Sequence, residues 1–155
     1  MSDQLTATDP LALERQVCFA LSVASRNVVA LYRPLLEPMG LTHPQYLVML
    51  ALWGESPLSV KEISGLLQLD PGTLSPLLKR LEVAGYVRRE RDPEDERQLA
   101  VTLTEAGIAL RAQAELIPAA MVRRLDMPVA ELEHLHEILT RVIAASRAEA
   151  PATIR

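Results

Sequence analysis

Cys18 is the only cysteine in the chain and therefore its only thiol. It lies in the segment QVCFAL, among apolar neighbours and with no lysine or histidine close by in the sequence. A thiolate at this position could react with a peroxide. A free cysteine is also among the most commonly buried residue types, and on composition alone a place in the core is the simpler explanation.

A second group of side chains offers hydrogen bonds and positive charge. Segment 79–91 carries five positive and two negative side chains, although the whole chain has a net charge of -4. Such a patch can bind phosphate locally, because salt screens distant charges beyond about 8 Å. A solvated surface is the alternative. The candidate contacts on a helix predicted over 73–84 are Thr73, Ser75, Lys79 and Arg80.

An acidic turn follows the basic segment. Asp92, Glu94, Asp95 and Glu96 would repel a phosphate backbone. Asp95 and Arg97 are two positions apart and point to one side of an extended chain, so Asp95 could orient Arg97. An arginine held in this way at a hairpin tip can enter a narrow minor groove.

Length and composition narrow the class of protein. The chain has 155 residues, of which 49% are hydrophobic and 23% charged, and this predicts one globular domain. A lone cysteine allows no internal disulfide and fits a reducing cytosol, so a cytoplasmic location is expected. We expect no membrane segment, metal or cofactor. His134 and His136 diverge by about 200° on a helix and cannot chelate one ion together.

Apolar periodicity predicts helices along most of the chain. Asp9-Pro10 is expected to start one long helix that ends near Gly40. Cys18 would then lie more than two turns from the N-terminal end of this helix, where the dipole contributes little. Capping boxes predict helix starts at Thr42 and Ser59. Later helices are expected after Thr104, with a bend at Pro118, and after Asp126.

The period changes between these helices. YVRRER and RQLAVTL predict two strands joined by the turn DPEDE. Two short helices around a tight turn, followed by a β-hairpin, indicate a winged helix-turn-helix. The predicted fold is therefore mostly α with a small β-hairpin, with the winged unit at about 42–104.

Three segments together resemble the MarR family, and in particular its organic-hydroperoxide-sensing OhrR branch of the one-cysteine type. They are QVCFAL…LYRPLLEPMG, LTHPQYLVMLALW and LDPGTLSPLLKRLEVAGYVRRERDPEDERQLAVTLTEAG. The D-x-R motif at Asp95 and Arg97 is common to MarR proteins. The surroundings of Cys18 and the LYRPLL segment are more particular to the peroxide-sensing branch.

The resemblance implies a homodimeric repressor in a single MarR-type domain, 1–155. Helices at about 10–40 and 105–147 would form the dimer, and the helix at 73–84 would enter the major groove of a pseudo-palindromic DNA operator. Oxidation of Cys18 by an organic hydroperoxide would release the DNA. A small cellular thiol would then pair with Cys18, because no second cysteine exists in the chain.

The resemblance also implies supporting residues for Cys18. In the family, a tyrosine at the position of Tyr32 forms a hydrogen bond with the reactive cysteine of the other subunit. A second tyrosine usually does so from the position that here is His43. Tyr32 lies on nearly the same helix face as Cys18 but about 21 Å along it, so only an antiparallel partner could join the two.

Other functions stay open from the sequence. A MarR-type repressor could answer to a small aromatic or phenolic ligand, with Cys18 inert. A dimeric helical protein could use the winged unit to bind another protein. A thiol peroxidase is disfavoured, since the chain has no resolving cysteine.

Overall fold

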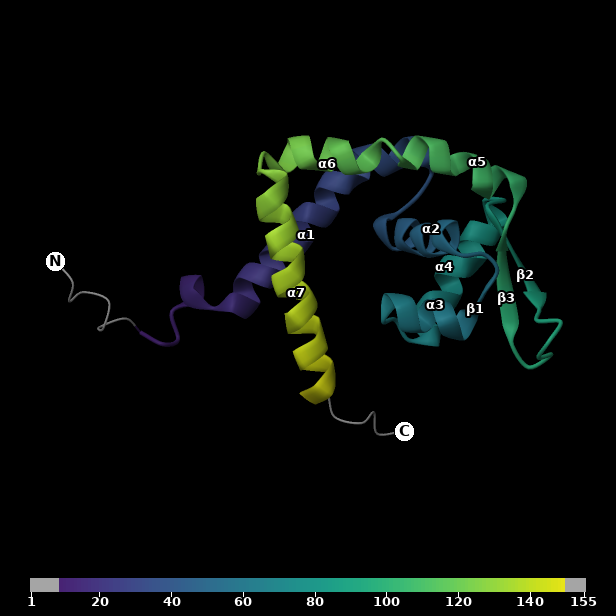
Figure 1. The fold of residues 1–155 in the computed structure, drawn as a ribbon, viewed down its shortest axis with the longest axis horizontal. Coiled ribbons are helices and arrows are strands. Elements are labelled where there is room, and N and C mark those ends of the chain that lie inside the picture. Colours follow the sequence, from purple (N-terminus) through teal and green to yellow (C-terminus); the bar gives the residue numbers. More distant parts are fainter. Residues whose placement is uncertain (1–8, 150–155) are drawn as a thin grey trace. The chain divides into compact units, whose positions relative to one another are not determined.

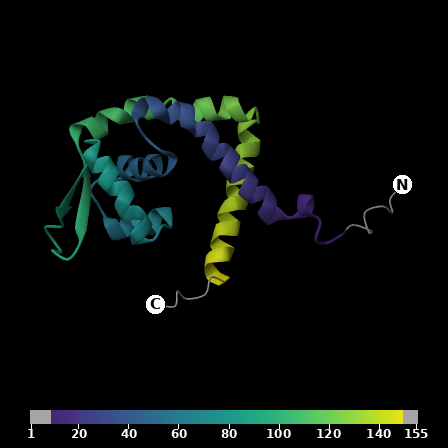
Figure 2. The ribbon, with the colours of Figure 1, turned by 180° about the vertical axis from the view of Figure 1, so that it is seen from behind.

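The computed structural model describes residues 9–149, which form mostly helices (Figures 1 and 2). The chain divides into two compact units, one ending at Glu115 and one beginning at Leu116. All strands of the described residues lie in the first unit.

The first long helix starts later than the sequence predicts. The Asp9 side chain accepts a hydrogen bond from the backbone N–H of Leu11. A single turn of 3-10 helix, η1, then covers Leu13–Arg15. Gln16 is then extended, with φ -80° and ψ 120°, and α1 runs over Val17–Leu36. The prediction of one continuous helix from Asp9-Pro10 is therefore wrong.

This break changes the position of Cys18 in its helix. Cys18 is the second residue of α1 and lies in its first turn. The first four N–H groups of a helix carry its positive dipole end. The expectation that the dipole is remote from Cys18 is therefore wrong.

A short connection leads from α1 into the second helix. The 3-10 turn η2, Glu37–Met39, ends at Gly40, whose positive φ of 68° suits glycine. Helix α2 covers His43–Gly54, and the predicted capping box between Thr42 and Gln45 is present. The side of α2 facing the core buries Gln45, Tyr46, Val48, Met49 and Leu52.

The next elements form the first half of the helix-turn-helix. Strand β1, Leu58–Ser59, leads directly into α3, Val60–Leu67. The predicted capping box is present, since Glu62 N–H donates to Ser59 Oγ at 3.0 Å and Ser59 N–H donates to Glu62 Oε2 at 2.9 Å. Ile63 of α3 is fully buried.

Helix α4 covers Pro71–Val83, starting two residues before the predicted 73–84. Asp70 is its N-cap, and Pro71 occupies the first helical position, where its missing N–H costs nothing. Pro76 lies inside the helix. The predicted apolar stripe is buried and consists of Leu74, Leu77, Leu78 and Leu81.

The β-structure is a three-stranded antiparallel sheet in the order β1-β3-β2. Strands β2, Val87–Arg91, and β3, Leu99–Leu103, form the predicted hairpin, with Val87 opposite Leu103. The sequence did not indicate β1, which pairs Leu58 with Val101. A two-residue strand is too short to show a period of two.

The helix after the hairpin is shorter than predicted. Thr104 caps α5, Glu105–Ala114, as expected, since its Oγ1 accepts from Gly107 N–H at 3.1 Å. Pro118 was expected to bend this helix. It lies instead in the first turn of a separate helix, α6, which covers Ile117–Leu125.

Asp126 was expected to cap the last helix, and this is wrong. Asp126 ends α6 in a left-handed conformation, with φ 50°, and its N–H donates to Val122 O. Helix α7 then covers Val129–Glu149. In the described residues no helix is long and apolar enough to cross a membrane.

Candidate nucleic-acid interface and redox site

The polar side of α4 is free for an external partner. Its leucines face the core of the first unit, whereas the four candidate DNA contacts are all exposed: Thr73, Ser75, Lys79 and Arg80. Hydroxyl and cationic groups of this kind bind phosphates and base edges in a major groove.

Asp70 holds Thr73 at the start of this face. Thr73 N–H donates to Asp70 Oδ1 at 2.9 Å, and the Thr73 hydroxyl donates to Asp70 Oδ2 at 2.9 Å. These two hydrogen bonds hold the pKa of the Asp70 carboxyl below its usual value. Asp70 was not singled out in the sequence, although the spacing of Asp70 and Thr73 matches an N-cap and its third helical residue.

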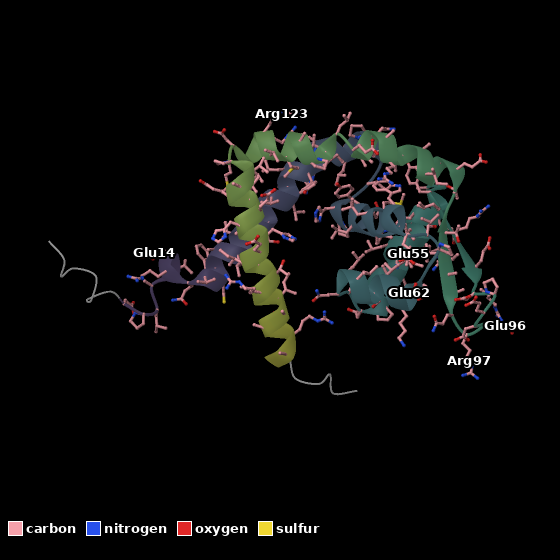
Figure 3. The ribbon with its side chains drawn as sticks, viewed as in Figure 1. Glu14, Glu55, Glu62, Glu96, Arg97 and Arg123 are labelled. Atoms are coloured by element: carbon pink, nitrogen blue, oxygen red, sulfur yellow. The ribbon has the colours of Figure 1, made fainter. Side chains whose placement is uncertain are left out.

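The hairpin tip carries Asp95 and Arg97, both exposed. In Figure 3 the Arg97 side chain extends away from the strands, at the tip that also carries Glu96. Asp95 Oδ1 accepts from the backbone N–H of Arg97 at 3.1 Å. Asp95 thus shapes the turn, and no ion pair between it and the Arg97 guanidinium occurs among residues 9–149.

Not all of the basic segment faces outwards. The Arg89 guanidinium lies 3.2 Å from Glu82 Oε1, and its backbone N–H donates to Glu82 Oε2 at 3.0 Å. Arg89 lowers the pKa of Glu82 through these hydrogen bonds. This pair joins the end of α4 to strand β2. Arg89 is therefore engaged within the chain, while the net charge of segment 79–91 is unchanged because Glu82 belongs to the same segment.

Cys18 is exposed and free. It lies in the first turn of α1, the turn whose backbone N–H groups have no partner within the helix. A buried place as core filling, the simpler explanation from composition, does not describe Cys18 within this chain.

Tyr32 and His43 lie next to each other, and a third aromatic ring joins them. The ring centroids of Tyr32 and His43 are 4.9 Å apart. Tyr46, with 4% of its surface exposed, lies 5.7 Å from Tyr32 and 6.4 Å from His43. Tyr46 was not predicted to belong here, although it follows His43 by three residues and so shares its side of α2.

Burial sets the protonation of this aromatic cluster, which consists of Tyr32, His43 and Tyr46. It raises the pKa of Tyr32 and lowers the pKa of His43. Burial also raises the pKa of Tyr46, and the negative charge of an ionised Tyr32 would raise it further. Near neutral pH Tyr32 is therefore a phenol that can donate a hydrogen bond, and His43 is an uncharged imidazole.

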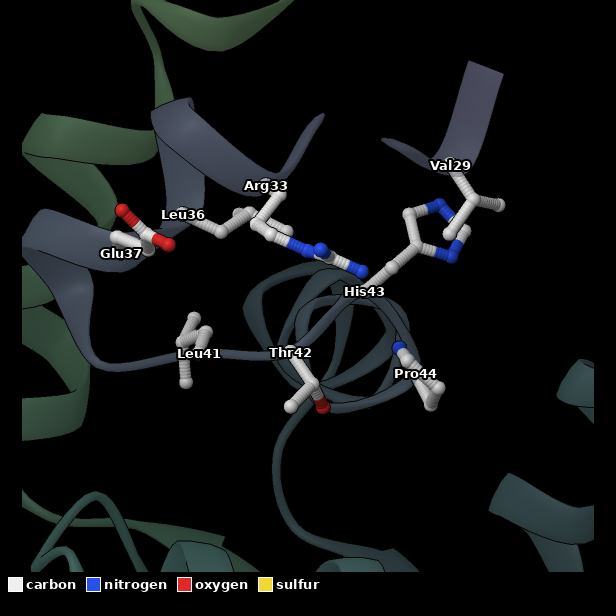
Figure 4. Close-up of a pocket in the computed structure, with 8 residues that line it drawn as sticks. All are labelled: Val29, Arg33, Leu36, Glu37, Leu41, Thr42, His43 and Pro44. Atoms are coloured by element: carbon white, nitrogen blue, oxygen red, sulfur yellow. The ribbon is translucent and has the colours of Figure 1, made fainter. Parts of the chain in front are cut away.

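A hollow of about 390 Å³ adjoins the cluster (Figure 4). The C-terminal half of α1 and the start of α2 form its walls. In Figure 4 the Arg33 side chain runs towards His43. The lining residues are Val29, Arg33, Leu36, Glu37, Leu41, Thr42, His43 and Pro44.

Comparison with known proteins identifies the family. A model described as the MarR family matches residues 41–99. The organic hydroperoxide resistance transcriptional regulator of Bacillus subtilis (strain 168) is 40% identical over 131 residues, which cover 84% of this chain and 89% of that protein. The chain belongs to the MarR family.

Two further comparisons agree with this assignment. The regulator TtmR of Methylorubrum extorquens (strain PA1) is 52% identical over 110 residues, but the match spans only 56% of TtmR. The crystal structure of AbfR of Staphylococcus epidermidis has a TM-score of 0.74 and 37% identity, covering 88% of this chain and 95% of AbfR.

The coarse function follows from the family. The relatives are named transcriptional regulators, and this chain is a MarR-type transcriptional regulator with the winged-helix fold. The matched range, 41–99, contains α4 and the hairpin tip with Arg97.

Proposed function

We propose that this MarR-type regulator is a homodimeric repressor that leaves its DNA operator when an organic hydroperoxide oxidises Cys18. The observation that carries the redox part is the exposed thiol in the first turn of α1. The relative from Bacillus subtilis is named for organic hydroperoxide resistance. AbfR has been solved reduced on DNA, overoxidised on DNA and in a disulfide-formed state.

The DNA part rests on the exposed polar face of α4 and on the hairpin tip. In the proposed complex α4 enters the major groove of one half-site and Arg97 reaches the adjacent minor groove. Two copies related by a two-fold axis would then read a pseudo-palindromic operator. The location expected for such a regulator is the cytoplasm.

The chemical step is a two-electron oxidation of sulfur. The Cys18 thiolate attacks one peroxide oxygen, the O–O bond breaks, and the hydroperoxide leaves as an alcohol after taking up a proton. Sulfur is oxidised to a sulfenic acid and the peroxide is reduced. A small cellular thiol then displaces water to form a mixed disulfide, since the chain holds no second cysteine.

Tyr32 and His43 would support this thiol from the partner subunit. Cys18 and Tyr32 both lie in α1, and the step of 14 positions from one to the other corresponds to about 21 Å of helix. One subunit cannot bring them together, whereas an antiparallel partner helix can. The Tyr32 phenol would donate a hydrogen bond to the thiolate.

The deciding experiment measures operator release by an organic hydroperoxide for wild type and Cys18→Ser, on DNA from the protein's own promoter. We expect the wild type to dissociate and the serine variant to stay bound. Mass spectrometry of the oxidised wild type should show a mixed disulfide with an added small thiol. Release of both proteins, or of neither, would contradict the proposal, as would oxidation only to a Cys18–Cys18 disulfide between subunits.

A second candidate is release by a small aromatic or phenolic ligand with Cys18 inert. The hollow beside Arg33 and His43 favours it, because its size falls in the range of small-molecule sites and a cation lines it. Under this alternative an aromatic carboxylate releases wild type and Cys18→Ser equally, and Arg33→Ala abolishes the release. Salt-independent DNA binding would instead favour a protein-binding role for the winged unit.

A further inference from the structure

The hydroxyl of Thr73 has a defined hydrogen-bond polarity. A threonine hydroxyl has one proton to donate and two lone pairs to accept with. In this chain the Thr73 hydroxyl donates its hydrogen bond to Asp70 Oδ2, at 2.9 Å. The backbone N–H of Thr73 holds the other oxygen of the same carboxylate at 2.9 Å, which keeps Asp70 in place.

Asp70 is the acceptor in this pair. Its lowered pKa means that the carboxyl is ionised at neutral pH and has no proton to give. The Thr73 hydroxyl therefore presents only lone pairs to a molecule that approaches the exposed side of α4. Phosphate oxygens, guanine O6 and thymine O4 also only accept, so none of them can bond this hydroxyl.

We propose that Thr73 reads the operator as an acceptor only, and so selects a base with an exocyclic amino group in the major groove. Those bases are cytosine, through N4, and adenine, through N6. The inference rests on the proposed function, in which α4 contacts DNA. It makes Thr73 a specificity-determining residue and Asp70 the positioning residue that sets its polarity.

Asp70→Asn inverts this polarity without removing the cap. Asparagine is as good an N-cap as aspartate, and its Oδ1 can still accept from Thr73 N–H. Its Nδ2 then occupies the place of Oδ2 and donates to Thr73 Oγ1. The Thr73 hydroxyl is then free to donate a hydrogen bond to the DNA, and the base preference at this position should change to guanine or thymine.

The experiment starts from a randomised duplex library, from which wild type, Asp70→Asn and Thr73→Val each select their preferred sites. Each adenine or cytosine of the wild-type site is then replaced by purine or 2-pyrimidinone, which lack the amino group. At one position per half-site we expect wild type to lose about fivefold in affinity and Thr73→Val to lose nothing further. Thr73→Ser should restore the dependence.

The outcomes separate this inference from the proposed function. A wild type that enriches no sequence overturns both DNA recognition and the assignment of Thr73. A wild type that enriches a site, with the same amino-group dependence in Thr73→Val at every position, overturns only the assignment. An unchanged base preference in Asp70→Asn overturns the role of Asp70.

Discussion

His43 is a half-buried histidine, and its protonation is therefore coupled to folding. Burial lowers its pKa from the ordinary value of 6.5, so the folded protein resists protonating it. The unfolded chain binds this proton more readily. Stability is therefore full above pH 6.5 and falls as the pH drops from 6.5 through the lowered folded pKa.

We predict that His43→Tyr removes most of this pH-dependent loss, because a tyrosine stays uncharged in this range. Urea unfolding of both proteins between about pH 7.5 and pH 5 measures the slope. His136→Gln is the matched control, since His136 is exposed on α7 and its replacement should leave the slope unchanged. Equal slopes for wild type and His43→Tyr would contradict the prediction.

Lys79 and Arg97 are predicted to contribute differently to DNA binding. Lys79→Ala should weaken binding to many sequences alike and reduce the salt slope by about one. Arg97→Ala should weaken operator binding by about tenfold or more, through a lost minor-groove contact. Gel shifts at several salt concentrations test both. Arg123→Ala, an exposed arginine on α6, is the control, and unchanged affinity in both variants would show that the recognition helix or the wing is misplaced.

At the scale of elements, Gly107 of α5 packs closely against the winged unit. Trp53 Nε1–H donates to the carbonyl of Gly107 at 2.9 Å. A Cβ on Gly107 would collide with the backbone carbonyl oxygen of Tyr86. Two backbones therefore meet here without room for a side chain, which local propensity cannot reveal.

We predict that Gly107→Ala destabilises the protein by about 1–3 kcal/mol, because backbone atoms would have to move. Gly65→Ala is the matched control, since a Cβ there has open space in the middle of α3. That change should stabilise by about 0.5–1 kcal/mol. Thermal and urea unfolding measure both, and equal effects of the two substitutions would contradict the packing described.

At the scale of the whole molecule, both units expose apolar side chains on long helices. On α1 and before it, Leu13 is 59% and Val17 69% exposed. On α7, Val129 is 54% and Ile143 46% exposed. Scattered apolar residues are normal on a surface, but stripes along two helices favour the proposed homodimer.

We predict that Ile143→Glu dissociates this dimer and lowers operator affinity at least tenfold, because the two half-sites are then no longer bound together. Ala148→Glu is the matched control, because Ala148 is exposed on α7 and lies about 140° around the helix from Ile143. Sedimentation equilibrium gives the mass and gel shifts the affinity. A monomeric wild type, or a dimeric Ile143→Glu variant with unchanged affinity, would contradict the prediction.

The sequence by itself determined the local elements that depend on neighbouring residues. Both capping boxes, the leucine stripe of α4, the Thr104 cap and the hairpin were predictable, because each rests on side chains within a few positions of one another. Short sequence motifs also indicated the family. The exposed residues on α4 follow directly from the stripe that is buried.

Only the tertiary structure decided what depends on distant contacts or on competition between local signals. The start of α1 at Val17 could not be read from the sequence, since Asp9 makes a good cap for a turn that does not propagate. The Glu82–Arg89 pair and the ring of Tyr46 beside Tyr32 join separate elements.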